Sequence, residues 1–245
     1  QIGDIGFIES ANERIAVVAT EKENGLIIHI VRELPENPAA EFTARVDPEK
    51  RQAAANNHTA THLLDAALKQ VLGEHVSQAG SLVTPEHLRF DFTHFEALSS
   101  EQLKAVEDLV NQQIFASKPV VTRVMGIDEA KAAGAVALFG EKYGDVVRVV
   151  SVGAEDKPFS RELCGGTHAA NTAEIGIMKI TSETSVGANV RRIEAVTSYG
   201  ALDYINKVEA ELKESAEELR VPLFDVSERT AANVKQLREF QKKAK

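Results

Sequence analysis

The chain has 245 residues, of which 43% are apolar and 27% charged, and its 28 Lys+Arg against 37 Asp+Glu give a formal net charge of −9. This composition is that of a soluble globular chain and excludes a disordered, collagen-like or disulfide-rich one. The single cysteine, Cys164, excludes an internal disulfide, and no apolar run reaches the roughly 20 residues of a membrane-spanning helix. We therefore expect a cytoplasmic, reducing setting and no membrane partner.

Residues 1–46 have the pattern of short strands. Two apolar runs, 15–19 and 26–31, flank Glu23-Asn24-Gly25, which is a hairpin-turn signal. Residues 42–46 alternate apolar and polar side chains, as on a half-buried strand. Such strands favour a small barrel or sheet, and we predict an N-terminal β-barrel over residues 1–46.

A long helix is predicted next. Asp47 supplies an N-cap, Pro48 a first helical position, and an Ala-rich stretch continues to Leu72 before Gly73. Because helix replaces strand here, we place a domain boundary near residue 47.

Residues 47–199 mix helices and strands. Strand patterns occur at 88–93, 120–125, 146–152, 175–181 and 190–197, and a helix capped by Ser99 or Ser100 carries an apolar stripe to Ile114. Because the strands and helices do not alternate strictly, the sequence favours an α+β fold.

Residues 200–245 change to helix. An apolar stripe from Leu202 to Leu219 predicts an amphipathic helix that ends before Pro222, and such a stripe usually forms a packing seam. A second helix, capped by Asp225 or Ser227, is expected to run to the end of the chain. Since the chain starts at Gln1 rather than Met and stops within a charged, helix-favouring run, we expect it to be part of a longer protein.

Two histidines of the first predicted helix, His58 and His62, are one turn apart on one face and can converge on one metal ion. Thr59 stands where a zinc protease has its glutamate, so the pair is not a His-Glu-x-x-His motif. Taken alone, the two side chains fit surface or core histidines equally well.

A second pair is formed by Cys164 and His168, with Gly165 and Gly166 between them to permit a tight loop. A lone cysteine is ordinarily a buried small hydrophobe. Together the two pairs make a complete ligand set of one thiolate and three imidazoles, which favours Zn²⁺ over magnesium or calcium.

Seven segments together resemble the editing domain of alanyl-tRNA synthetases. They are QIGDIG at 1–6, HTATH at 58–62, QAGSLV at 78–83, LRFDF at 88–92, ALFGEKYGD at 137–145, CGGTH at 164–168 and VRRIEAVT at 190–197. The resemblance extends from residue 1 to about residue 200. The tail, 200–245, resembles the helical connection to the C-terminal domain of those enzymes.

The resemblance implies hydrolysis of tRNA(Ala) mischarged with serine or glycine, because an alanine pocket excludes neither amino acid well. It implies that His58, His62, Cys164 and His168 hold zinc, and that Thr61 and Gln78 line the amino-acid pocket. Without the resemblance, Thr61 would be expected to bond back to its own helix and Gln78 to face solvent.

The resemblance leaves the acid–base chemistry open. A zinc that polarises a carbonyl or lowers the pKa of a bound water would suffice, yet four protein ligands are typical of a closed structural site. Asp91 and His94 are candidate proton carriers, with surface placement as the alternative. Arg191 is the candidate tRNA contact, with a salt bridge as the alternative.

Three other functions remain open. One is a zinc-stapled tRNA-binding or interaction module without activity, and another is a free-standing alanyl editing protein. The third is the editing domain of threonyl-tRNA synthetase, which the CGGTH and QIGDIG segments disfavour. The alanyl interpretation also implies that the remaining domains of a full-length synthetase are partners.

Overall fold

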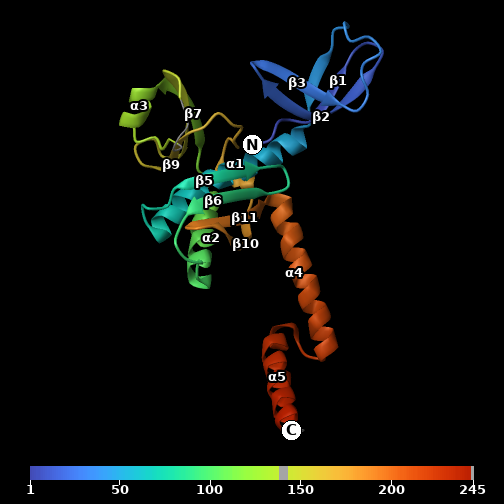
Figure 1. Cartoon of the computed structure of the whole chain (residues 1–245), viewed down its shortest axis with the longest axis vertical. Coiled ribbons are helices and arrows are strands. Elements are labelled where there is room, and N and C mark those ends of the chain that lie inside the picture. Colours follow the sequence, from blue (N-terminus) through green and yellow to red (C-terminus); the bar gives the residue numbers. More distant parts are fainter. Residues whose placement is uncertain (138–142, 244–245) are drawn as a thin grey trace. The chain divides into compact units, whose positions relative to one another are not determined.

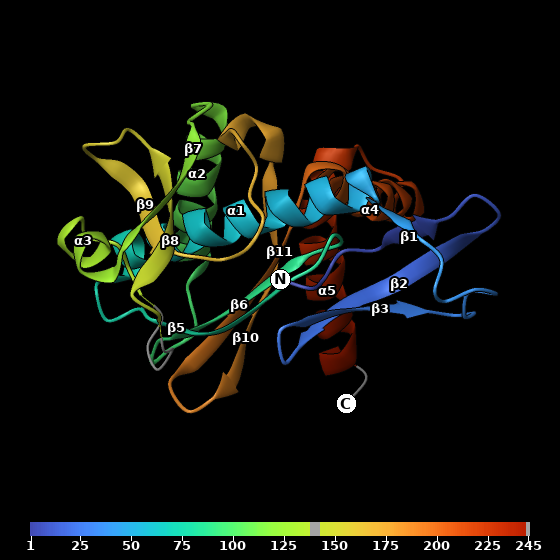
Figure 2. The same cartoon turned by 90° about the horizontal axis from the view of Figure 1, so that it is seen from above.

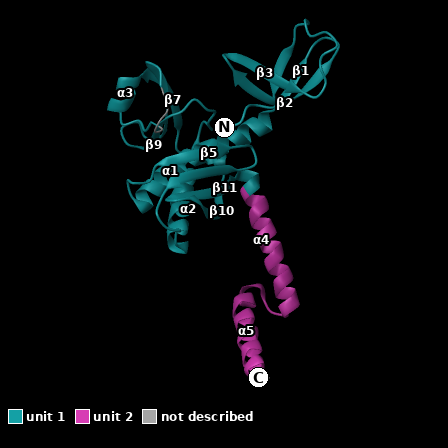
Figure 3. Ribbon diagram, in the orientation of Figure 1, with its two compact units in different colours: residues 1–200 teal, residues 201–245 magenta. Residues whose placement is uncertain are grey.

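The computed structural model describes residues 1–137 and 143–243, and it is a mixed α+β structure with antiparallel sheets (Figure 1). The chain divides into a unit of residues 1–200 and a helical unit of residues 201–245 (Figure 3). Within the described ranges, no helix is long and apolar enough to cross a membrane. Most of the ALFGEKYGD segment, 138–142, lies outside the described residues.

The N-terminal strands form one antiparallel sheet in the order β3-β2-β1-β4. The predicted hairpin is confirmed: Glu23 pairs with Leu26, and Asn24 and Gly25 both have positive φ, as a tight two-residue turn requires. The strands are β1 (Gly6–Glu9), β2 (Arg14–Glu23), β3 (Leu26–Val31) and β4 (Thr43–Val46).

This sheet is open, so the predicted N-terminal barrel is not what the structure shows. Closure requires the two outer strands to pair, and the described residues contain no ladder between β3 and β4. Four strands are also few for a ring, since even small barrels commonly use about eight. The half-buried character predicted for β4 is wrong as well: every residue of β4 is exposed, and Val46 is 42% accessible.

The predicted long helix is confirmed as α1 (Pro48–Leu72). The Asp47 carboxylate accepts hydrogen bonds of 3.0 Å from the backbone N–H groups of Glu49 and Lys50, and Gly73 ends the helix at φ 112°. Most of the middle of α1 is buried. Figure 2 shows the helix lying across the sheet that holds β5, β6, β10 and β11.

That sheet has the order β10-β11-β6-β5 and carries the main core. Its face packs against α1 and α2 (Ser100–Phe115) around fully buried side chains that include Leu64, Phe90, Phe92 and Ile193. Its strands are β5 (Gln78–Val83), β6 (Leu88–Thr93), β10 (Met178–Gly187) and β11 (Val190–Thr197). We had not predicted β5, and β10 starts later than expected because a 3₁₀ turn occupies Thr172–Ile175.

A third sheet, β7-β8-β9, comprises Val120–Gly126, Val146–Gly153 and Pro158–Leu163, with the short helix α3 (Ile127–Ala132) beside it. The sequence pattern predicted neither α3 nor β9. Strand β9 matters for function because it ends immediately before Cys164.

The C-terminal unit contains the predicted helices. Helix α4 (Ser198–Leu219) begins at the end of the first unit, and a 3₁₀ turn (Leu223–Asp225) after Pro222 leads into α5 (Val226–Lys243). Leu202 and Val208 of the apolar stripe of α4 are exposed. The packing seam expected for this stripe therefore stays a prediction.

Candidate metal centre

Four side chains from two distant segments converge within the first unit. Helix α1 contributes His58 and His62 from successive turns, and the loop after β9 contributes Cys164 and His168. One ligand atom from each of these residues lies within 4.8 Å of the other three. The structure therefore brings together all four residues that the sequence proposed as metal ligands.

Two of the distances between donor atoms are close to those expected around a tetrahedral zinc ion. Cys164 Sγ lies 3.4 Å from His58 Nε2 and 3.3 Å from His168 Nε2. Zinc bonds of about 2.0–2.3 Å at tetrahedral angles separate their ligand atoms by about 3.5 Å. A thiolate with three imidazoles is also a donor set that zinc prefers.

The outward nitrogen of His58 is held by the first residue of the chain. His58 Nδ1 lies 3.0 Å from Gln1 Oε1, which also accepts the backbone N–H of Thr167 at 2.8 Å. Because Thr167 N–H is a donor, this Gln1 atom acts as an acceptor, so Nδ1 carries the proton and Nε2 is free to bind a metal.

His168 has a similar arrangement, whereas His62 lacks the hydrogen bond. His168 Nδ1 lies 3.2 Å from Thr59 Oγ1, and His62 Nδ1 faces Glu162 Oε2 at 3.4 Å. The latter separation falls within ion-pair range, but His62 Nδ1 makes no hydrogen bond within the described part of the chain. An outer oxygen therefore faces each Nδ1, as is typical of metal-binding histidines.

Burial keeps these imidazoles neutral. It lowers the pKa of His58 to about 4 and that of His62 to about 3, and it also lowers the pKa of His168. Burial raises the pKa of the Cys164 thiol. Neutral imidazoles are the form that ligates metal, so three of the four ligands need no proton loss at neutral pH.

Gly166 makes room for this packing. A Cβ at position 166 would lie on His58, closer than any real Cβ contact, whereas a Cβ at Gly165 would meet no atom within 4 Å. The second glycine of the CGGTH loop is therefore required by close approach to a proposed ligand.

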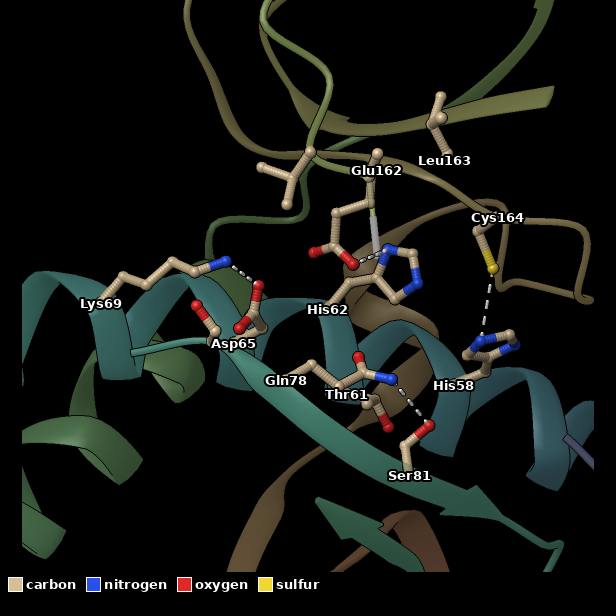
Figure 4. A pocket seen from close by; sticks show the side chains of 13 residues that line it. His58, Thr61, His62, Asp65, Lys69, Gln78, Ser81, Glu162, Leu163 and Cys164 are labelled. Carbon is tan, nitrogen blue, oxygen red and sulfur yellow. Dashed lines mark hydrogen bonds and ion pairs between the residues drawn. The ribbon is translucent and has the colours of Figure 1, made fainter. Parts of the chain in front are cut away.

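A cavity adjoins three of the proposed ligands (Figure 4). Thr61 and Gln78 both line it; the Thr61 hydroxyl donates to Asn57 O at 2.8 Å, and Gln78 Nε2 donates to Ser81 Oγ at 3.3 Å. The helix back-bond weighed for Thr61 is thus present, and the residue still faces the cavity. The lining comprises His58, Thr61, His62, Asp65, Lys69, Ser77, Gln78, Ser81, Val136, Ala137, Glu162, Leu163 and Cys164.

Comparison with known proteins indicates the family of the chain. A family model described as "Threonyl and Alanyl tRNA synthetase second additional domain" matches residues 147–194. All of the chain aligns at 50% identity with 29% of an alanine–tRNA ligase from Pseudomonas fluorescens, and 99% of it aligns at 50% identity with 28% of one from Bacteroides fragilis. The chain belongs to the alanyl-tRNA synthetase family.

The chain spans less than a third of the length of these synthetase relatives. The relatives that align with the whole chain are alanine–tRNA ligases, which favours the alanyl interpretation over the threonyl one left open by the sequence.

The two proposed proton carriers of this synthetase segment lie on β6 and just after it. Asp91 forms a two-point ion pair with Arg192 at 2.7 and 2.8 Å, and His94 Nδ1 lies 2.8 Å from His75 Nε2. Neither Asp91 nor His94 lines the cavity described above. Their role in proton transfer stays a prediction.

Arg191, the proposed tRNA contact, forms a two-point ion pair with Glu183 at 2.5 and 2.8 Å. This is the salt bridge that the sequence offered as the alternative. Arg191 and Arg192 pair with different carboxylates, as expected for neighbours on opposite faces of a strand.

The charged end of the cavity, formed by Asp65, Lys69 and Glu162, is not among the site residues expected from the sequence. Burial, together with the charge of Asp65, raises the pKa of Glu162 to about 8. Asp65 and Lys69 follow His58 by seven and eleven residues, so helical spacing offered a signal for them. Glu162 gave none, because it lies on the unpredicted strand β9.

Proposed function

We propose that this chain hydrolyses the ester of tRNA(Ala) mischarged with serine or glycine. The observation that supports this most directly is the convergence of four zinc-type donors beside a cavity lined by Thr61 and Gln78. A synthetase for alanine needs such a second site, because its synthetic pocket admits glycine and discriminates poorly against an added hydroxyl.

His58, His62, Cys164 and His168 would hold the zinc ion. Bound zinc supplies Lewis-acid polarisation of the ester carbonyl and a lowered pKa for water. Thr61 and Gln78 would contact the amino-acid side chain, and Gln78 offers both a donor and an acceptor to a serine hydroxyl. The imidazoles would stay neutral, and outer oxygens would hold those of His58 and His168.

The partners follow from the same proposal. The mischarged tRNA would present its 3′ end at the cavity, with Arg191 as a candidate phosphate contact, and other parts of a synthetase would hold the rest of the tRNA. The reduced thiol that this centre requires suits a cytoplasmic setting.

Deacylation measures this function directly. Zinc-loaded chain should release serine from Ser-tRNA(Ala) and glycine from Gly-tRNA(Ala) faster than buffer does, and should leave Ala-tRNA(Ala) nearly untouched. A chelator should abolish the release, and added zinc should restore it. Absence of hydrolysis by folded, zinc-loaded chain would contradict the proposal.

A second candidate is a zinc-stapled tRNA-binding module without activity. It is favoured by the number of protein ligands, since four is typical of a closed structural zinc site. Zinc-dependent tRNA binding without deacylation would support it.

A further inference from the structure

The cavity beside the proposed metal centre has a charged end whose hydrogen bonding is incomplete. Asp65 and Lys69 follow His62 along the same face of α1, and Glu162 approaches from β9 (Figure 4). Asp65 is only 5% exposed. A carboxylate buried to this degree needs donors for its oxygens, because water cannot supply them freely.

Two of the four carboxylate oxygens at this end have a hydrogen-bond or ion-pair partner, and a third only lies near an imidazole nitrogen. Glu162 Oε1 accepts a 2.7 Å hydrogen bond from Ser160 Oγ, and Oε2 faces His62 Nδ1 at 3.4 Å. Asp65 Oδ2 pairs with the Lys69 ammonium. Asp65 Oδ1 is buried and has no hydrogen-bond partner within residues 1–137 and 143–243. One buried acceptor on a residue that lines the cavity therefore lacks a partner.

The substrate class proposed above carries a matching donor. Every aminoacyl ester has an α-ammonium two bonds from its carbonyl carbon. A substrate whose carbonyl lies near the metal centre therefore has its ammonium within a few ångströms of that centre. Hydrogen bonds between an ammonium and a carboxylate are among the strongest in proteins. We propose that Asp65 Oδ1 binds the α-ammonium of the aminoacyl ester, an inference that rests on the proposed function.

Lys69 supports this role without competing for it. Its ammonium occupies Oδ2 and so holds the carboxylate in one orientation, which leaves Oδ1 for the ligand. Because serine, glycine and alanine all carry the α-ammonium, Asp65 orients the substrate and does not select among amino acids. Selection then falls to residues such as Thr61 and Gln78.

Binding of two non-hydrolysable analogues tests the inference by calorimetry on the zinc-loaded full chain. One analogue is adenosine carrying serine through a 3′-amide, and the other replaces its α-ammonium with a hydroxyl. The wild-type chain should bind the ammonium form about 10–100-fold more tightly. Asp65→Asn, which is nearly isosteric, should reduce this ratio toward one.

Asp108→Asn is the matched control. Asp108 also pairs with a lysine four residues away, Lys104, but on the exposed surface of α2. This variant should keep the wild-type ratio.

Equal affinity of the two analogues for the wild-type chain, an unchanged ratio in Asp65→Asn, or failure of both analogues to bind would overturn the inference. The wild-type ratio needs no variant, so it stands even if Asp65→Asn does not fold. Hydrolysis of Ser-tRNA(Ala), measured in parallel, separates the two proposals. If the chain hydrolyses Ser-tRNA(Ala) but binds both analogues equally, only the role of Asp65 is contradicted. If it prefers the ammonium analogue but does not hydrolyse Ser-tRNA(Ala), the deacylase function is contradicted and the ammonium site is retained.

Discussion

Cys164 lies between two imidazole nitrogens, at 3.4 and 3.3 Å from its sulfur. The same residue by itself would be an ordinary buried thiol, and its pKa is raised by burial. Its chemistry therefore comes from its neighbours. The converging nitrogens favour a metal ligand over a passive core side chain.

Cys164→Ala tests that interpretation. Loss of an outer-shell partner commonly weakens metal binding 10–100-fold, so loss of a direct ligand should weaken zinc binding by at least about a hundredfold. Competition with a chromophoric chelator measures the affinity. Unchanged affinity in a folded variant would remove Cys164 from the centre.

The two glycines of the CGGTH loop should respond differently to alanine. Gly166→Ala places a methyl group on His58 and should displace that ligand, lowering zinc affinity about 10–100-fold. Gly165→Ala adds a methyl group in open space and serves as the control. Equal zinc affinities of the two variants would contradict the close approach described here.

At the scale of elements, α1 carries much of the site. One face of this helix presents His58 and His62 to the metal position, then Thr61, Asp65 and Lys69 to the cavity. The strands β5 and β9 add Gln78 and Glu162. The residue at which α1 begins therefore matters for all the α1 side chains in the site.

Asp47→Ala should lower the free energy of unfolding by about 1 kcal/mol, because it removes the acceptor for two backbone N–H groups. Urea denaturation followed by circular dichroism measures the change. Asp47→Asn keeps the capping oxygen and should remain close to wild type. A similar loss in both variants would indicate that charge, and not the cap, matters.

At the scale of the whole molecule, the centre couples stability to pH in the metal-free chain. His58 and His62 have pKa values of about 4 and about 3 against an ordinary 6.5, so the unfolded chain binds more protons as the pH falls below 6.5. Stability therefore falls toward acid pH. Glu162 acts oppositely: with its pKa raised from 4.5 to about 8, its contribution is lost as the pH rises through this range.

Below pH 6.5 three imidazoles with lowered pKa values, those of His58, His62 and His168, outweigh two carboxyls with raised pKa values, those of Asp65 and Glu162. We therefore expect the metal-free chain to be most stable near pH 6.5. Urea midpoints at pH 5, 6.5 and 8, with chelator present, check this. Glu162→Gln should abolish the decline above pH 6.5 and keep the acid decline. A wild-type midpoint that rises steadily from pH 6.5 to 8 would contradict the linkage.

Local sequence signals were sufficient for several elements. Asp47, Pro48 and Gly73 delimited α1, and Asn24-Gly25 located the first hairpin, because caps and tight turns depend on neighbouring backbone groups. The ligand set was also predictable from the sequence, since helical spacing joined His58 to His62 and the loop joined Cys164 to His168.

Only the tertiary structure decided the rest. The sequence pattern did not reveal that the sheet of β1–β4 is open. Strand pairing is non-local, so a pattern of strands does not show which sheet edges meet. Glu162 and Asp65 line the same cavity because β9 contacts α1, and these two elements are far apart in the chain. The sequence alone thus predicted a metal centre of this type, whereas the fold determined which buried charges surround the four candidate ligands, since burial and partner distance exist only after packing.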